Sequence, residues 1–247
     1  ANTDFLTEIR LRAFAPASIT KNGKNFAFDL GAEYVGKAQF NPSYLRPKFE
    51  MNGLWEAPYV IFENGTEINA TGEVIGLREN PYFERTVEHF SSHAQTPNDI
   101  TVTTPAITVG KDGAYIAFNI FTEYAIQGSL IARETVIGVL NKLLGENKTL
   151  TTNLPAQGVT TLMEQKGENR YVNHLLYAAP VKRGQRAEII EDLIPVYNTE
   201  VAMKLQKQPK RVYLAPQMKD IAYTYENGIL RYTVDKFTCH QMVAIEY

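Results

Sequence analysis

A change of pattern at Gly145 constrains the fold of this chain more than any other feature of its sequence. Before it lie a continuous apolar run at 114–121 and a segment from Ile126 to Leu144 with helical spacing. After it, short stretches of alternating apolar and polar residues recur to the C-terminal end, separated by turn residues. A buried strand that leads into an amphipathic helix is typical of an α/β domain, whereas recurrent short strands are typical of a β-sandwich. The sequence therefore predicts two units of different class.

The first unit, residues 1–147, is predicted to be an incomplete α/β unit from its last strand and helix. The run at 114–121 is expected to be a strand covered on both faces. The helix is expected to end at Gly145, a residue type favoured just after a helix. Its main apolar stripe is predicted to be Leu130, Ile137, Leu140 and Leu144, widened by Ile131, Val136, Val139 and Leu143.

Earlier segments of this unit carry weaker patterns. Residues 1–50 have little periodicity apart from a short candidate strand at 26–29, so the chain is expected to begin partway through a fold or to wrap over another part. Residues 58–75 are predicted to form a hairpin whose turn is Asn64-Gly65. Prolines bracket residues 80–97, and a short helix fits between them.

The second unit, residues 148–247, is predicted to be an all-β sandwich. Its clearest element is a hairpin of Ile221–Glu226 and Ile229–Asp235, because their period of two agrees with the Asn-Gly turn between them. Strands are expected at 159–164, 171–177, 187–190, 200–205, 210–214, 220–226, 229–235 and 240–246. Eight short strands in about 100 residues indicate two packed sheets.

Composition excludes several classes of partner. The net charge of −2 offers no basic face, so nucleic acid is not expected. No apolar run approaches the roughly 18 residues of a membrane-spanning helix, so no membrane association is predicted. The single cysteine, Cys239, excludes an internal disulfide and any site with several cysteine ligands.

The sequence contains no complete set of catalytic residues. His89 and His93 have the spacing of zinc ligands on a helix, but Phe90 stands where the zincin pattern requires Glu. Neighbouring residues on a strand point to opposite faces, so Cys239 and His240 cannot form a nucleophile–base pair. Nucleophile-elbow, phosphate-loop and dinucleotide motifs are absent. We therefore predict no metal site, no cofactor and no activity for this chain alone.

Five side chains are candidates for contact with a ligand: Trp55, Tyr82, Arg85, His89 and His93. A loop tryptophan can stack on a sugar ring or anchor an interface, although a core position under the loop is the preferred interpretation of Trp55. Arg85 lies among aromatic residues and could bind a carboxylate or a sugar hydroxyl. An ion pair with Glu84 or Glu88 is its preferred interpretation.

Three segments resemble the C-terminal half of large bacterial glycoside hydrolases. The first is 80–97, with Asn80-Pro-Tyr-Phe-Glu-Arg and a following His-Phe-Ser-Ser-His. The second combines 117–124 with 128–134, and the third combines 174–183 with 188–193. The similarity covers most of residues 25–247 and is greater to the α-L-fucosidase branch than to β-galactosidases.

This resemblance implies a fold and a role. In such enzymes a catalytic barrel precedes a β-galactosidase trimerisation domain, which is flavodoxin-like and related to glutamine amidotransferases, and a terminal β-sandwich. No residue of the chain corresponds to the barrel that carries the catalytic carboxylates. The resemblance implies the late part of the trimerisation domain plus the sandwich, with the missing N-terminal barrel or further copies of the chain as partners and carbohydrate bound through the parent enzyme.

Three functions remain open at this point. The first is a non-catalytic structural and oligomerisation region of a glycoside hydrolase, which predicts exposed apolar surface. The second is a carbohydrate-binding module acting alone, which predicts exposed aromatics such as Trp55 or Tyr82 in a shallow groove. The third is a glycoside hydrolase with an unrecognised site, which predicts a deep pocket with two facing carboxylates or a histidine pair with perturbed pKa values.

Overall fold

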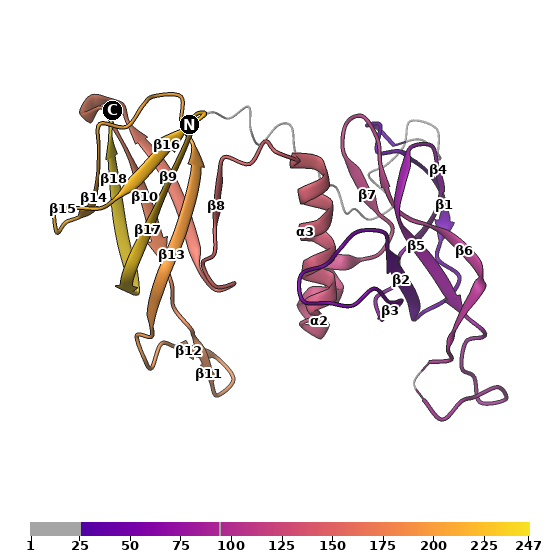
Figure 1. Cartoon of the computed structure of the whole chain (residues 1–247). Coiled ribbons are helices and arrows are strands. Elements are labelled where there is room, and N and C mark those ends of the chain that lie inside the picture. Colours follow the sequence, from indigo (N-terminus) through magenta and orange to yellow (C-terminus); the bar gives the residue numbers. More distant parts are fainter. Residues whose placement is uncertain (1–25, 94) are drawn as a thin grey trace. The chain divides into compact units, whose positions relative to one another are not determined.

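The computed structural model describes residues 26–93 and 95–247, which form two compact units (Figure 1). The first unit ends at Gly145, and the second runs from Glu146 to Tyr247. The irregular start predicted for the chain falls partly on residues 1–25, outside the described residues. From Ala32 onward the chain already forms strands that the sequence pattern did not indicate. No helix in the described ranges has both the length and the apolar character needed to cross a membrane.

The first unit is built on an antiparallel sheet with two helices and a separate two-stranded ribbon. The order in the sheet is β3 (Tyr59–Ile61), β2 (Ser43–Pro47), β5 (Glu73–Pro81), β6 (Asn98–Val109) and β7 (Ala114–Ile116). The ribbon pairs β1 (Ala32–Lys37) with β4 (Thr66–Ala70). Helices α2 (Ile120–Gln127) and α3 (Leu130–Leu144) follow β7 in the chain.

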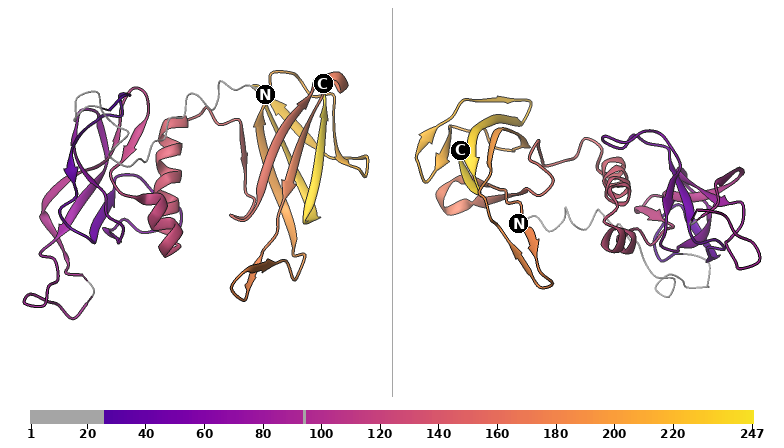
Figure 2. Two further views of the ribbon diagram at one scale, coloured as in Figure 1. Left: turned by 180° about the vertical axis from the view of Figure 1, so that it is seen from behind. Right: turned by 90° about the horizontal axis from the view of Figure 1, so that it is seen from below.

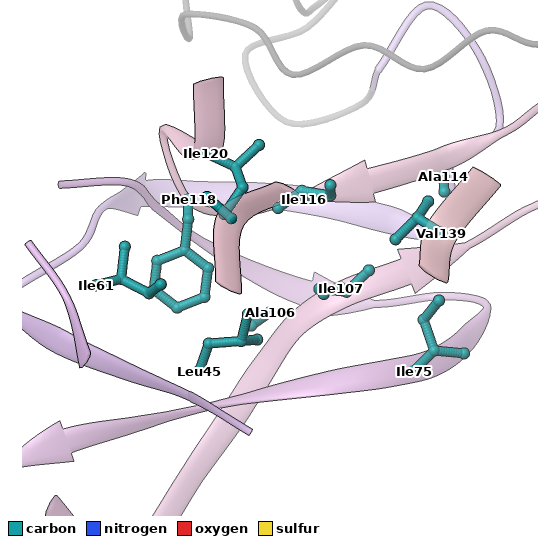
Figure 3. Close-up of a cluster of buried hydrophobic side chains, with 11 residues drawn as sticks. Leu45, Ile61, Ile75, Ala106, Ile107, Ala114, Ile116, Phe118, Ile120 and Val139 are labelled. Atoms are coloured by element: carbon teal, nitrogen blue, oxygen red, sulfur yellow. The ribbon is translucent and has the colours of Figure 1, made fainter. Parts of the chain in front are cut away.

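Strand β7 shows how this unit is layered. Its Ala114 and Ile116 join the cluster that includes Val139 of α3 (Figure 3). Its Tyr115 points the other way, into a second cluster with Ile68 of the ribbon. Successive residues of a strand face opposite sides, so the helices cover one face of the sheet and the ribbon covers the other.

The prediction of an incomplete flavodoxin- or amidotransferase-like α/β unit is wrong. Every strand pairing in the described part of this unit is antiparallel, and strands far outnumber the two α-helices. A flavodoxin-like unit needs parallel strands joined by crossover helices, whereas antiparallel neighbours can be joined by turns. The apolar run at 114–121 was interpreted as one buried strand. Only its first three residues form a strand, and helix α2 begins at Ile120.

The predicted helix ends where expected but is divided near its start. Gly128 adopts a left-handed conformation with φ of 62° and closes α2. The Ser129 hydroxyl then accepts a hydrogen bond from the backbone N–H of Ala132 at the beginning of α3. The packed face also differs from the main predicted stripe: Val139 is buried, whereas Leu130 and Ile137 are 44% and 39% exposed.

The predicted hairpin at 58–75 does not form. Its two strands exist, but β3 pairs with β2 and β4 pairs with β1. Gly65 instead lies against the backbone of Phe118, where a Cβ atom would be 2.0 Å from the carbonyl oxygen of Ala117. This glycine therefore permits a close approach of two backbones and does not form a hairpin turn.

The second unit is a β-sandwich, as predicted. One sheet has the order β15 (Lys219–Asp220), β14 (Arg211–Ala215), β18 (His240–Glu246), β10 (Arg170–Leu176) and β9 (Val159–Gln165). The other has the order β16 (Tyr223–Glu226), β17 (Ile229–Thr238), β13 (Pro195–Lys204) and β8 (Leu150–Thr152). A small hairpin pairs β11 (Val181–Arg183) with β12 (Ala187–Ile189), and a 3₁₀ turn spans Lys166–Glu168.

Alternating residues of both sheets create the core of the sandwich. The two sheets of this unit face each other (Figure 2). Leu175 and Val243 from one sheet pack with Met203 and Leu230 from the other, and each is buried. The turn between β16 and β17 holds Asn227 and Gly228 at φ of 52° and 76°. Two left-handed residues match the type I′ turn that the sequence predicts.

Candidate functional site

Residues 82–93 and 95–97, between β5 and β6, extend away from the body of the first unit and are called the arm below (Figure 1). Its base is fixed by Glu79, which is 1% exposed at the end of β5. The Glu79 carboxylate forms an ion pair with Arg46 of β2 and accepts a hydrogen bond from the amide of Asn98 on β6. A charged group at this depth requires such partners, so Glu79 joins the two ends of the arm to β2.

A second set of contacts anchors the returning end of the arm. The Tyr44 hydroxyl donates to the carbonyl of Thr96, and burial raises the pKa of Tyr44. The Thr96 hydroxyl donates to the carbonyl of Phe83 at 3.2 Å. The backbone N–H of Tyr82 donates to the carbonyl of Pro97 at 3.2 Å. These bonds hold the arm at its base with both ends side by side.

The tip of the arm is a locally bonded turn. The backbone N–H of Thr86 donates to the carbonyl of His89 at 2.7 Å, and the N–H of His89 donates to the Thr86 hydroxyl at 3.0 Å. The rings of Phe83 and His89 stack with centroids 3.6 Å apart and planes at 12°. The short helix that the sequence allowed between the prolines does not form in the described residues of the arm, because the Thr86 hydroxyl and the ring stack stabilise a turn.

The outer surface of the arm is apolar. Val87 is 91% exposed, Phe90 is 71% exposed and Tyr82 is 61% exposed. Sequence reasoning singled out Tyr82 but missed Val87 and Phe90. Both could have been recognised from the sequence, because they are apolar side chains in a segment that prolines keep out of regular structure. Several exposed apolar groups on an anchored projection are a feature typical of interaction surfaces.

The structure places four of the five predicted contact residues on the arm. Arg85 is exposed and forms no ion pair with any residue of the described part of the chain, so the expected bridge to Glu84 or Glu88 is wrong. Glu84 instead accepts a hydrogen bond from the backbone N–H of Asn41 at 2.8 Å. The carbonyl of His93 accepts a bond from the Ser91 hydroxyl. Within the described ranges, no three histidine, cysteine or acidic residues lie in a metal-binding group.

Trp55, the fifth candidate, lies elsewhere in the first unit. It is 90% exposed in the loop from β2 to β3, so the interpretation as a core residue is wrong. Pro47 of β2 pairs with Gly76, whereas Tyr44 pairs with Glu79 at the base of the arm. The Trp55 loop therefore leaves β2 at the end away from the arm, and the two do not form one site.

The buried carboxylates in the described part of the first unit all have structural partners. Glu79 is used at the arm, as described above. Glu123 of α2 accepts hydrogen bonds from the backbone N–H groups of Phe62 and Glu63, both at 2.9 Å. Glu134 of α3 forms an ion pair with Arg133 at 2.7 Å. The Glu123 contacts fix the loop after β3 to α2, and among residues 26–93 and 95–145 no buried carboxylate is left without a partner.

Arg78 of β5 is a buried cation without a carboxylate partner. It is 2% exposed, and its two terminal nitrogens donate to the carbonyls of Thr66 at 2.6 Å and Ala117 at 2.7 Å. Its guanidinium lies 4.4 Å from the ring centroid of Phe118. Desolvation lowers the pKa of Arg78 to about 10, so the group remains charged at neutral pH. Arg78 therefore joins β5 to the ribbon and to the chain after β7.

Helices α2 and α3 expose several apolar side chains. These residues, called the helix face below, are Phe121, Tyr124, Ile126, Leu130 and Ile137. Each is between 39% and 63% exposed, while the opposite side of α3 is packed on the sheet. Exposed apolar groups of this number on neighbouring helices are typical of an interaction surface.

Comparison with solved structures shows a clear similarity to a named enzyme. The chain superposes on α-L-fucosidase isoenzyme 2 from Paenibacillus thiaminolyticus with a TM-score of 0.88 and 45% sequence identity. The match covers 94% of this chain and 36% of the fucosidase, so the chain spans about a third of that enzyme. No protein-family model matches the sequence. No curated protein matches it either. In fold and sequence, the chain is similar to one part of an α-L-fucosidase.

Proposed function

We propose that this chain is a non-catalytic structural and oligomerisation region of a glycoside hydrolase of the α-L-fucosidase type. The observation that carries this proposal is the similarity of nearly the whole chain to about a third of a named fucosidase. At 45% identity over 94% of the chain, a shared role within a larger enzyme is the simplest interpretation.

Two surfaces of the first unit support an assembly role. The arm holds Val87 and Phe90 in solvent on an anchored base, and the helix face holds Phe121 and Ile137 in solvent on a packed layer. Exposure of such groups is unfavourable by roughly 25 cal/mol per Å² of apolar surface, so burial against another surface would stabilise an assembly. The structural use of the buried carboxylates supports a non-catalytic role for this unit.

Light scattering of the purified full chain over a range of concentrations tests this proposal. We expect association that weakens in an arm variant, Val87→Glu with Phe90→Glu, or in a helix-face variant, Phe121→Glu with Ile137→Glu. A matched control, Val159→Glu with Met163→Glu, changes two exposed apolar residues of the second unit, which are 55% and 59% exposed. A chain that stays monomeric at high concentration, or that associates equally in all variants, would contradict the oligomerisation role.

A further inference from the structure

The second unit contains a wide groove that none of the contacts described so far uses. It has a volume of about 1020 Å³ and lies over the sheet formed by β16, β17, β13 and β8. That volume is at the upper end of the roughly 300–1,000 Å³ of small-molecule sites, so it can hold more than one small ring. Because the groove is formed within residues Glu146–Tyr247, it belongs to this unit alone.

Strand register defines the floor of the groove. Ala202 of β13 pairs with Thr151 of β8 and with Arg231 of β17, and Arg231 pairs in turn with Thr224 of β16. These four residues form one row across the four strands. Their short side chains, Arg231 excepted, leave space above the sheet. The opposite side of the same strands faces the apolar core, as Val201 and Tyr232 show.

A second row lies directly beside the first. Glu200 of β13 pairs with Thr233 of β17. The backbone N–H of Glu200 donates to the Asn153 side chain at 2.9 Å, and the amide of Asn153 donates to the carbonyl of Asn198 at 3.1 Å. Asn153 thus fixes the chain after β8 against β13, and the Glu200 carboxylate remains directed to solvent.

Glu200 and Arg231 carry opposite charges on diagonal positions of neighbouring strands but form no ion pair in the described part of the chain. Both are exposed, and no hydrogen bond of either side chain to another described residue is present. A carboxylate and a guanidinium held about 7–8 Å apart or less can each take one edge of a polyhydroxylated ring. The two charged groups are therefore free to bind a ligand.

Acidic and basic residues at the rim of the groove balance one another in charge. Lys219 and Asp220 lie on one side, with Asp220 paired to Arg211 at 2.7 Å, and Asp235 and Lys236 lie on the other. Equal numbers of acidic and basic groups line the groove, so it favours neither a polyanion nor a polycation. The threonine hydroxyls of the floor add neutral donors and acceptors.

We infer that this groove binds a neutral saccharide, with Glu200 and Arg231 as the principal contacts. A neutral sugar offers neighbouring hydroxyls that can donate to the carboxylate and accept from the guanidinium, and such charge-assisted bonds are stronger than neutral ones. The choice of a saccharide as the ligand rests on the proposed function, whereas the position and polarity of the groove do not. The site differs from the arm and from Trp55, which belong to the first unit.

Calorimetric titration of the full chain with methyl α-L-fucoside, D-galactose and 2′-fucosyllactose tests this inference. We expect binding of at least one of them, weakened tenfold or more by Glu200→Gln and by Arg231→Ala. Thr233→Trp, which fills the floor without removing a charge, should also abolish binding. Matched controls are Glu188→Gln and Arg186→Ala, which change exposed residues in and beside the β11–β12 hairpin and should leave the affinity unchanged.

Absence of binding by all three sugars at millimolar concentration would overturn the inference. Equal affinity in the wild type and the groove variants would also overturn it, because the sugar would then occupy another surface. Stronger binding of a sulfated disaccharide than of the neutral sugars would contradict the charge balance on which the choice of ligand depends. The groove variants should leave association in light scattering unchanged, so failure of this inference and failure of the proposed function give separate results.

Discussion

The two units of this chain are held together in different ways. In the described part of the first unit, four charged side chains are buried: Arg78, Glu79, Glu123 and Glu134. In the second unit the buried polar side chains are uncharged: Asn173, Thr199 and Gln241. Arg78, Glu79 and Glu123 bind main-chain or charged groups from other elements, so these contacts position irregular segments, whereas Glu134 pairs with Arg133 of its own helix.

The second unit relies on its apolar core and a small neutral network. The amide of Asn173 donates to the Thr160 hydroxyl and the Thr161 carbonyl, both at 2.8 Å. The Tyr232 hydroxyl donates to Asn173 at 2.7 Å, and burial raises the pKa of Tyr232 strongly. The comparison indicates that regular sheets need few buried polar contacts. A unit with an arm and covering layers needs buried charges where these parts meet the sheet.

Removal of the Arg78 guanidinium should give the largest effect. In Arg78→Met two buried hydrogen bonds from a charged donor, to the carbonyls of Thr66 and Ala117, are lost, and such bonds contribute about 1.5–3 kcal/mol each. We expect the free energy of unfolding of the first unit to fall by about 2–6 kcal/mol. Hydrogen exchange followed by mass spectrometry should show faster exchange in residues 26–145 and unchanged exchange in 146–247.

Arg78→Lys is the companion variant should Arg78→Met fail to fold. It keeps the charge but cannot reproduce the planar fork that reaches both carbonyls, so an intermediate loss is expected. Wild-type stability in both variants would refute the role of Arg78 in holding β5 to the ribbon and to the chain after β7.

A core truncation in the second unit should have a slightly smaller effect on stability. Its effect on hydrogen exchange should be confined to the second unit. Leu175 is fully buried between the two sheets, and Leu→Ala substitutions at such positions cost about 2–5 kcal/mol. In Leu175→Ala we expect faster exchange in residues 146–247 only. Equal destabilisation of both units by either variant would mean that the two cores unfold together.

A glycine substitution in the first unit should have the smallest of these effects. In Gly65→Ala the new Cβ meets the Ala117 carbonyl, so the β4 backbone must shift at a cost of about 1–3 kcal/mol. Gly36→Ala is the matched control, since a Cβ at Gly36 has no heavy atom within 4 Å. Thermal melting of both variants gives the comparison, and a Gly36→Ala protein less stable than Gly65→Ala would reverse our interpretation of Gly65.

The same contrast explains how much the sequence could predict. The strands at 159–164 and 240–246 were located to within a residue or so, because alternation along a strand is a local signal. In the first unit, β4 pairs with β1 although Asn64-Gly65 suggested a hairpin with β3. Pairing between distant segments leaves no local pattern, so the class of this unit could not be read from one apolar run and one helix.

The candidate site was predicted less completely than the sandwich. The segment 80–97 drew attention through its prolines and aromatic residues, and it forms the arm. Its neighbours in space, Glu79 and Asn98, anchor it through contacts that no spacing in the sequence reveals. The groove could not be predicted from the sequence either, because Glu200 and Arg231 come together only through the register of β13 and β17.

We propose above that this chain is a non-catalytic part of a glycoside hydrolase. The most direct test of this claim is the hydrolysis of 4-nitrophenyl α-L-fucoside by the purified full chain at high protein concentration. We predict a rate equal to that of buffer alone. A rate that rises in proportion to protein concentration, and that falls on substitution of a single carboxylate of the chain, would contradict the claim.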